Sequence, residues 1–355
     1  MADNVKMFGN RKAVVEVQFN WIFILIVGGL LLLFFGGFIV KQKQAADIKL
    51  SSQVITDLEA VLIGAGVSAG AAELIEIPDI PIAITCDKFG IKDVEKPISK
   101  ANPIFGPNLI KGNFLVTWTK PWDIPFRVTN FLFVTTPQVR YVLVGAGDFA
   151  EDVFNELPPR TITYDEEPRL TMNKEMLADI SAMENLKNYK VRFVFFGQQD
   201  LTMQAIPEKL ASMPDEDITA VAINGDFNFG QVDFYVKSGD TFEKKGSSAY
   251  LGDTTLFGAI FAEDIETYEC VMNKAFTKLN IVAGIYLDRV LNLFADYSSD
   301  PVCSTYYEDG AYFDAIKAYA SAGFSANAAV GMKDLPSLMK VRNDNIARAS
   351  CVSIY

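Results

Sequence analysis

The stretch best suited to chemistry is RYVLVGAGDFAED, at residues 140–152, where an apolar run stops at two glycines. Gly145, Gly147 and Ala150 match the pattern G-x-G-x-x-G/A, with a strand-like run before them and a helix-prone stretch after them. A second strand-like segment ends near Glu166, about 20 residues on, where an acidic residue would bind a ribose hydroxyl. The pattern predicts a dinucleotide site in which backbone N–H groups and the helix dipole hold a pyrophosphate.

A structural interpretation of the same glycines is favoured over the nucleotide site. The helix-prone stretch DFAEDVFNEL is short and is cut off by Pro158 and Pro159. Its first turn carries Asp148, Glu151 and Asp152, which already complement the positive helix end and would repel a diphosphate. Glycine makes a tight strand-to-helix turn at low steric cost, so the motif has an explanation without a ligand.

Acidic residues at the expected carboxyl ends of the strands form a second candidate site. Ligands of open α/β sheets favour this edge, and several carboxylates there could hold Ca²⁺ or Mg²⁺. The chain has no EF-hand or similarly spaced acidic loop, and solvated loop acids explain the same residues, so no cofactor is predicted. The candidate metal ligands are Asp148, Asp165, Asp200 and Asp226, with Glu166 beside them.

Composition excludes several classes of function. The chain has 355 residues, a net charge of −12 and no histidine. Without histidine there is no Ser-His or Cys-His nucleophile pair, no His-ligated zinc and no imidazole base. Residues 1–50 carry six basic and three acidic residues, which leaves −15 on the rest of the chain. A body of that charge repels phosphate backbones, so nucleic-acid binding is disfavoured.

Residues 21–40 read WIFILIVGGLLLLFFGGFIV, without a charge. Twenty helical residues span about 30 Å, which is the hydrocarbon thickness of a bilayer. Trp21 lies where an interfacial aromatic residue is expected, and Lys41 and Lys43 end the run. A cleaved signal peptide usually has a shorter apolar core and a small-residue cleavage site, so the run predicts an uncleaved, single-pass anchor in the lipid bilayer.

The residues after the anchor keep helical spacing through residues 41–64, which predicts a helical stalk continuous with the membrane span. Small residues recur on nearly one face of the span and permit close approach of a second helix, which suggests self-association through the span. These residues are Gly28, Gly29, Gly36 and Gly37.

Four cysteines lie beyond the anchor: Cys86, Cys270, Cys303 and Cys351. None forms a C-x-x-C pair, so a zinc or redox motif is poorly supported, whereas two disulfides would fit an oxidising exterior. The flanking Lys and Arg residues give no orientation, because three lie on each side of the span. The cysteines therefore place the large C-terminal part outside the cell. Of the three pairings, one that joins Cys270 to Cys351 is attractive if a returning helix brings the chain's end to the start of a long one.

The order of the predicted strands and helices around these residues indicates the α/β fold class. Over the whole chain, where strands and helices also occur in separate regions, the organisation is α+β. A β-rich region is followed by an open, mainly parallel, Rossmann-like sheet and a helical C-terminal region. The predicted parts are a short N-terminal segment, the membrane span, the stalk, the β-rich region, the α/β domain and the helical region, at 1–20, 21–40, 41–64, 65–136, 137–263 and 264–355.

Within the α/β domain, strand-like and helix-like segments alternate. The predicted strands are 139–144, 161–164, 191–196 and 218–223, and the predicted helices are 148–157, 173–186 and 207–213. The segments QVDFYV and TLFGAIF are expected to extend the sheet with antiparallel strands. From Asp264, an apolar stripe at three- and four-residue spacing predicts a long amphipathic helix ending near Asp296, followed by helices at about 310–321 and 334–349.

The segments VQFNWIFILIVGG, TNFLFVTTP, YECVMNKAF and SCVSIY together resemble uncharacterised single-anchor envelope proteins of small-genome archaea. This resemblance implies an archaeal envelope setting and carries no activity or catalytic residues. The order of basic leader, apolar helix, amphipathic extension and β-containing head also looks like a type IV pilin. It departs from that pattern because Glu16 precedes the apolar run.

The leading hypothesis is a membrane-anchored extracellular structural or interaction protein, acting in surface architecture, adhesion or a filament. It rests on the anchor, the absence of histidine and the lack of a coherent catalytic set, so an enzyme is less favoured. The alternatives are an anchored α/β enzyme or ligand-binding protein that uses Gly145 and Gly147 or the strand-end carboxylates, and a pilin-like subunit. The expected partners are lipid, further copies of the chain or other envelope proteins, and not nucleic acid.

Overall fold

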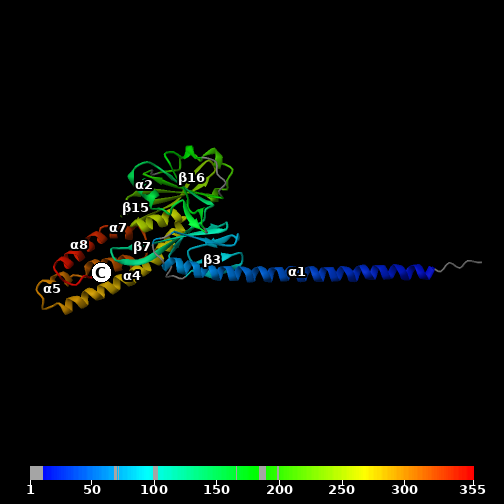
Figure 1. Ribbon diagram of the computed structural model, residues 1–355, viewed down its shortest axis with the longest axis horizontal. Coiled ribbons are helices and arrows are strands. Elements are labelled where there is room, and N and C mark those ends of the chain that lie inside the picture. Colours follow the sequence, from blue (N-terminus) through cyan, green and yellow to red (C-terminus); the bar gives the residue numbers. More distant parts are fainter. Residues whose placement is uncertain are drawn as a thin grey trace, which may run out of the picture. The chain divides into compact units, whose positions relative to one another are not determined.

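The computed structural model describes residues 11–67, 70, 72–98, 103–164, 166–183, 189–197 and 200–355, excluding the side chains of 11–20, 22, 24, 39–40, 43–48, 50, 61, 65–67 and 164. The chain divides into two compact units, Met1–Val54 and Ile55–Tyr355. The second unit contains mixed α/β structure, as the sequence predicts (Figure 1).

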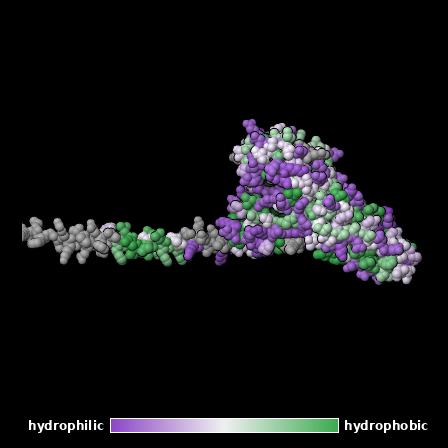
Figure 2. All heavy atoms as spheres, turned by 180° about the vertical axis from the view of Figure 1, so that it is seen from behind, coloured by the Kyte–Doolittle hydropathy of each residue, from purple (hydrophilic) through white to green (hydrophobic). Residues whose placement is uncertain are grey.

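Helix α1 (Arg11–Val67) is one continuous helix through the predicted span and stalk. Large apolar side chains between Trp21 and Phe38 are exposed, and Figure 2 shows them as an apolar band on α1. Over the described residues, none of the helices combines the length and the apolar character that a membrane crossing requires. The membrane span at residues 21–40 therefore stays a prediction.

The predicted β-rich region forms two small four-stranded sheets. The first has the order β1-β7-β8-β5, with bounds Ala72–Glu76, Phe114–Asp123, Arg127–Thr135 and Ile104–Phe105. The second has the order β4-β3-β2-β6, with bounds Val94–Pro97, Lys88–Ile91, Ile82–Ile84 and Leu109–Ile110. Aromatic residues of β7 and β8 provide the core of the first sheet: Trp118 packs against Phe133, and Trp122 against Phe131.

The central sheet has six strands in the order β12-β9-β13-β14-β15-β16. The first four are parallel, and the last two add in antiparallel fashion. Successive residues of β9 alternate between two cores: Tyr141 and Leu143 face one core, and Val142 and Val144 face the other. In order of position, the strands are Asn173–Leu177, Val139–Val144, Lys190–Phe196, Ile218–Gly225, Phe229–Ser238 and Thr241–Leu251.

Several predicted elements of this domain are wrong. The predicted helix at 173–186 is, over its described residues, strand β12 followed by the 3₁₀ turn η1 (Ile180–Ala182). Its parallel ladder with β9 overrides the helix propensity of Lys174, Glu175 and Met176. The predicted helix at 207–213 contains only the 3₁₀ turn η2 (Glu208–Leu210).

Two predicted strands are also misplaced. The segment at 161–164 is a strand, β10 (Thr161–Tyr164), but it pairs with β11 (Glu167–Leu170) in a separate two-stranded sheet. The segment TLFGAIF lies in helix α3 (Asp253–Phe261), most of which is buried. A short apolar run fits a buried helix as well as a strand, and only the surrounding core distinguishes them. QVDFYV is confirmed as an antiparallel strand within β15.

The helical C-terminal region is confirmed. Helix α4 (Ile265–Asp296) begins where predicted, because the Asp264 side chain accepts a hydrogen bond from Thr267 N at 2.6 Å and caps it. Its predicted stripe is buried at Tyr268, Met272, Ala275 and Leu279. The remaining helices are α5 (Cys303–Tyr307), α6 (Ala311–Ser321), α7 (Ala326–Met332) and α8 (Leu335–Arg348).

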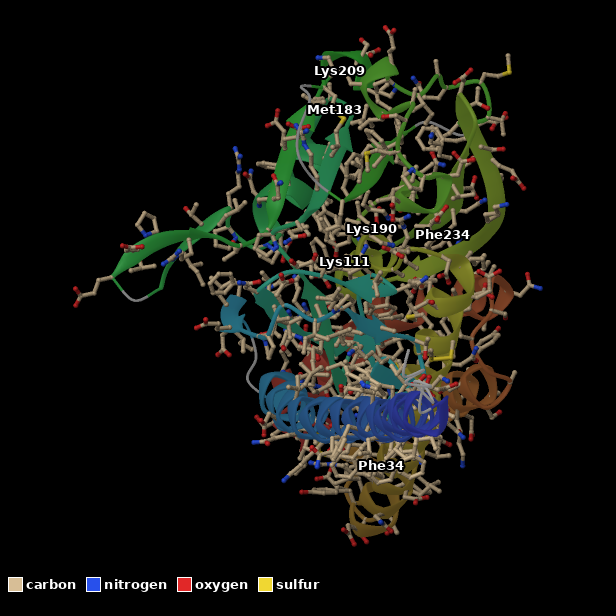
Figure 3. The ribbon with its side chains drawn as sticks, turned by 90° about the vertical axis from the view of Figure 1, so that its right-hand side faces the viewer. Phe34, Lys111, Met183, Lys190, Lys209 and Phe234 are labelled. Atoms are coloured by element: carbon tan, nitrogen blue, oxygen red, sulfur yellow. A yellow bond between two sulfur atoms is a disulfide. The ribbon has the colours of Figure 1, made fainter. Side chains whose placement is uncertain are left out.

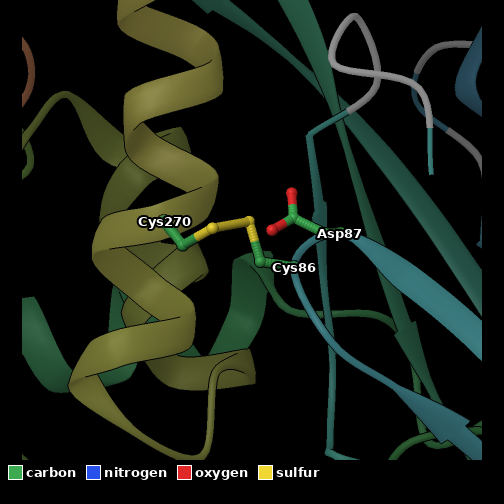
Figure 4. A group of neighbouring side chains, drawn as sticks. All are labelled: Cys86, Asp87 and Cys270. Carbon is green, nitrogen blue, oxygen red and sulfur yellow. A yellow bond between two sulfur atoms is a disulfide. The ribbon is translucent and has the colours of Figure 1, made fainter. Parts of the chain in front are cut away.

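Two disulfides are present, Cys86–Cys270 and Cys303–Cys351. Pairing of Cys270 with Cys351 is therefore wrong. A helix of the 32 residues of α4 is about 48 Å long, and Cys351 meets Cys303 just beyond the far end of α4 from Cys270. Figure 4 shows the bond that ties Cys86, after strand β2, to α4.

Candidate functional site

The glycine motif lies where the sequence predicts it. Strand β9 ends at Val144, and Gly147 precedes helix α2 (Asp148–Glu156). Gly145 and Gly147 have φ of +145° and +116°, values that L side chains rarely adopt. A Cβ on Gly145 would lie 3.3 Å from the Cβ of Phe196, whereas one on Gly147 would meet no atom within 4 Å. Gly145 is thus needed for both its backbone angle and its packing.

The sheet order places this turn at a topological switch point. β12 and β13 lie on opposite sides of β9, so the connections after β9 and β13 lead in opposite directions. In open α/β sheets, ligands bind in the crevice that such a reversal creates at the carboxyl ends of the strands. One geometric requirement of the nucleotide interpretation is therefore met.

Aromatic rings pack together at this carboxyl edge. The ring of Phe149, in the first turn of α2, lies 5.6 Å from that of Phe196 at the end of β13, at 90°. It lies 5.1 Å from the ring of Phe227, after β14, at 78°. These edge-to-face contacts are a favourable aromatic geometry and occupy space beside the turn. This packing favours the structural interpretation of the glycines.

The other residues of the predicted nucleotide site have separate environments. Ala150 is a buried residue within α2. Glu166 lies in the turn of the β10–β11 hairpin, with a φ of +63°, and not at the end of a strand of the central sheet. A dinucleotide site needs its acidic residue on the strand next to the glycine turn, and the structure does not bring Glu166 there.

Substitution of the two glycines tests the structural interpretation. We expect Gly145→Ala to lower the free energy of unfolding by about 2 kcal/mol, because of its positive φ and the contact with Phe196. Gly147→Ala is the matched control and should cost less, because its side chain would point into open space. Chemical denaturation followed by circular dichroism measures both. A thermal stabilisation by NAD or ATP that Gly145→Ala abolishes would contradict this interpretation and support a nucleotide site.

The predicted metal ligands do not converge in the described part of the chain. Asp200 accepts a hydrogen bond from Thr202 N at 2.9 Å, and this bond holds the pKa of its carboxyl below the usual value. Asp226 accepts from Asn228 N at 2.7 Å, so both residues close local turns. Asp148 begins α2, and Asp165 lies outside the described residues.

Across the described residues, the group of potential metal ligands within 4.8 Å of one another consists of Cys86, Asp87 and Cys270. Two of its three ligand atoms are the sulfurs of a disulfide, which lack the thiolate that binds a metal. The geometry of this group is thus that of a disulfide with a neighbouring carboxylate (Figure 4).

A cleft of about 360 Å³ lies at the opposite edge of the central sheet from the glycine turn. It is bounded by the amino end of β14, by β15 and β16, by the start of α4 and by the segment before β6. Phe234 lines it together with polar and charged residues, among them Asn108, Glu216, Lys245, Asp264 and Glu266. Its volume falls within the range of small-ligand pockets.

Two local features of β16 shape this cleft. The register between β15 and β16 shifts at Phe234 and Tyr235, where Phe234 pairs with Gly246 and Tyr235 with Lys244. Lys245 is thus the extra residue of a β-bulge, a device that redirects side chains. A Cβ on Gly246 would lie 2.7 Å from Cδ1 of Ile265, so this glycine lets the first turn of α4 approach the sheet.

A buried ionic network forms the wall behind the cleft. Lys190 Nζ, at the start of β13, lies 2.7 and 2.8 Å from the two carboxylate oxygens of Glu263. Asn108 N donates to the same carboxylate at 3.2 Å, and its Nδ2 donates to Asp264 at 2.7 Å. Figure 3 shows Lys190 and Phe234 between the central sheet and the β-rich region.

Arg192, two residues along the same strand, is also buried. It donates to the backbone carbonyls of Ala259, Ile260 and Glu263, and so holds the end of α3 against the sheet. Burial lowers the pKa of Arg192 to about 10, which leaves it charged at neutral pH. Burial also raises the pKa of Tyr141. The network therefore fixes the relative positions of β13, the α3–α4 connection and Asn108.

Sequence reasoning missed this cleft, although two signals pointed toward it. Lys190 and Arg192 are charged residues in a strand that is otherwise strongly apolar, and buried charges need partners. Asp264 stands directly before the long amphipathic helix, as an N-cap does. The residues that meet these charges come from segments remote in the chain, so spacing could not identify them.

Protein-family models, curated proteins and solved structures were each compared with this chain, and none of the three comparisons finds a match.

Proposed function

We propose that this protein is a membrane-anchored structural or interaction protein of an archaeal cell surface, with its large C-terminal part outside the cell. The observation that carries the proposal is the uncharged run at residues 21–40. Six consecutive side chains in it, at residues 30–35, are each between 52% and 76% exposed. At 100° per residue, six positions cover the whole circumference of a helix, and such a helix is suited to lipid.

The direction of insertion is supported by the cysteines. All four lie beyond residue 40, and all four are joined in disulfides. Disulfides persist in oxidising compartments and are rare in reducing ones. Exposure to the cell exterior also separates the glycine turn from cytoplasmic nucleotides, which agrees with the aromatic packing beside it.

Protease shaving of intact cells tests this proposal. We expect externally added protease to remove the C-terminal part, and the chain to resist extraction from membranes at high pH. Replacing Leu32 with Lys should weaken membrane retention, since a lysine at the centre of a span costs about 3 kcal/mol. Leu170→Lys is the matched control, because Leu170 is also exposed but lies on the β10–β11 hairpin. Recovery of the unaltered chain in the soluble cytosolic fraction would refute the proposal.

Self-association is proposed as a consequence of the anchor. Adding a Cβ at Gly28, Gly29, Gly36 or Gly37 would meet no atom of the described chain within 4 Å. Small residues on a membrane helix let a second helix approach closely. Crosslinking in membranes should therefore capture a dimer or larger assembly, as expected of a surface lattice or pilin-like filament. Replacing these glycines with residues that have large side chains should reduce the amount of crosslinked assembly.

Ligand binding at the glycine turn is the second candidate function. The specific observation in its favour is the topological switch point between β9 and β13. A ligand there would have to displace Phe149 from Phe196 and Phe227, and the glycine substitutions described above test for it.

A further inference from the structure

We propose that the outer edge of strand β10 pairs with the same edge of a second copy of this chain, which joins two hairpins into one antiparallel sheet. The inference deepens the proposed structural function and rests on it, because the membrane anchor is what concentrates copies of the chain. It adds a second contact to the helix contact proposed above. Chains that alternate the two contacts can extend into a row.

The β10–β11 hairpin stands apart from the larger sheets. Its two strands pair with each other and, over the described residues, with no other strand. Thr161, Thr163 and all four residues of β11 are exposed. Figure 3 shows the hairpin as a green arm that projects beside the central sheet, at the left of the view. A two-stranded hairpin is only marginally stable in water, and further strands stabilise it.

The backbone pattern decides which edge of the hairpin can accept another strand. Thr171 N donates to Arg160 O at 2.9 Å, so these two residues form a hydrogen-bonded pair between the strands. Such pairs alternate with non-hydrogen-bonded pairs along an antiparallel ladder, and the pair of Thr161 with Leu170 comes next. The N–H and C=O groups of Thr161, and of Thr163 two residues on, therefore point away from β11. In the described part of the chain, no hydrogen bond reaches them.

The opposite edge of the hairpin is closed to pairing. The residues of β11 that point outward are Pro168, which faces Thr163, and Leu170, which faces Thr161. Proline has no N–H and is tolerated on an edge where its nitrogen faces solvent, so it prevents a further strand from adding there. Strand β10 contains no proline and has the β-prone sequence Thr-Ile-Thr-Tyr. The hairpin thus offers its β10 edge for pairing.

A second copy of β10 fits this edge in antiparallel register. With Ile162 on a two-fold axis, Thr161 of each chain faces Thr163 of the other, and each such pair exchanges both of its backbone hydrogen bonds. The two copies of Ile162 then face each other at a non-hydrogen-bonded position. Their Cα atoms would lie about 4.5 Å apart, and their apolar side chains would be in contact.

Charge favours a second copy of this chain as the occupant. The turn of the hairpin is acidic, with exposed Glu166 and Glu167, and its base carries the exposed Arg160. Among the described residues Arg160 and Glu166 form no ion pair, while Glu167 lies 3.1 Å from Arg169. Antiparallel pairing places the acidic turn of each hairpin beside the basic start of the other, so opposite charges meet at both ends. Parallel pairing would place the two acidic turns side by side, where they repel.

Disulfide trapping in membranes tests the proposal. The full chain with Ile162→Cys is treated with a mild oxidant and examined on non-reducing gels; the four native cysteines are already joined in disulfides. We expect about fivefold more crosslinked dimer than with Leu170→Cys, because only the copies of residue 162 lie within reach of a disulfide. Leu170 is the matched control: it is exposed on the same hairpin, but the two β11 strands of the proposed sheet lie about 14 Å apart.

Two further variants of the Ile162→Cys chain identify the contact. Thr163→Pro removes an outward N–H without removing a hydrogen bond between β10 and β11, and should reduce the dimer to the level of the control. Arg160→Glu should reduce it as well, because it places acidic groups beside the acidic turn. Arg160→Glu/Glu166→Arg should restore the dimer, since it exchanges the two charges in both copies.

The proposal is overturned if residues 162 and 170 are trapped equally, because the contact would then be a random collision. It is also overturned if the chain stays in the membrane without an Ile162→Cys dimer, or if this cysteine crosslinks to a different protein instead. Release of the chain from the membrane would contradict the proposed function, and trapping in concentrated detergent solution would then decide whether the β10 contact exists. Unchanged circular dichroism spectra and melting temperatures establish that the variants are folded.

Discussion

Replacing Cys86 and Cys270 together by alanine is expected to lower the free energy of unfolding by about 4 kcal/mol. This disulfide joins positions 184 residues apart, so it restricts the unfolded chain strongly. It also fastens the segment after β2 to α4, where Lys274 donates to the backbone carbonyl of Cys86 and lies 3.4 Å from Asp87. Without the disulfide, the segment that contains Cys86 and Asp87 is no longer covalently joined to α4. Urea denaturation of the oxidised chain and of the double variant measures the difference.

The second disulfide supplies the control. Cys303 and Cys351 are 48 residues apart, so their replacement by alanine should destabilise the chain by about 1 kcal/mol less. Treatment of the wild-type chain with reductant should reproduce the sum of both losses. If the two double variants lose equal stability, or if the Cys303–Cys351 variant loses more, loop length is not the controlling factor. Local packing around α5 would then dominate.

The second large effect is expected at the buried ion pair. Lys190→Met should lower the free energy of unfolding by about 3 kcal/mol, because it leaves the Glu263 carboxylate buried without its cation. The side chains of Lys190 and Glu263 are only 9% and 11% exposed, so solvent screens the remaining charge poorly. The charge of Arg192 also attracts the Glu263 carboxylate, but its hydrogen bond to Glu263 is to the backbone carbonyl, so it does not take the place of the lysine contact.

A double-mutant cycle separates this charge effect from simple loss of packing. Lys190→Met/Glu263→Gln removes both charges, while the glutamine oxygen can still accept from Asn108 N. We expect this double variant to recover at least half of the stability lost by Lys190→Met alone. If the two substitutions destabilise additively, the pair contributes no coupling. The structural role of the network would then rest on Arg192 and its backbone partners.

The cleft and the ion pair also show why some tertiary features could not be predicted from the sequence. A motif with local spacing, such as Gly145 to Ala150, is visible in the chain whether or not it binds anything. Lys190, Glu263 and Asn108 are brought together by the docking of the β-rich region and α4 on one sheet. Their proximity depends on the order of the strands in the sheet and on the packing of these segments, and neither leaves a periodic signal in the sequence.

The sequence by itself determined the elements whose apolar pattern is long or strongly periodic: the helix through residues 21–64, the buried strands at 139–144 and 191–196, and the long helix α4. It also determined the β-rich region and the strand–turn–helix at Gly145, because short-range steric preferences act within a few residues. Tertiary structure alone decided that 173–177 is a strand, that 255–261 is a helix, and which cysteines pair. Hydrogen bonds to β9 decide the first outcome, burial of α3 the second, and the packing that brings Cys86 to Cys270 and Cys303 to Cys351 the third. Each of these depends on contacts between residues far apart in the chain.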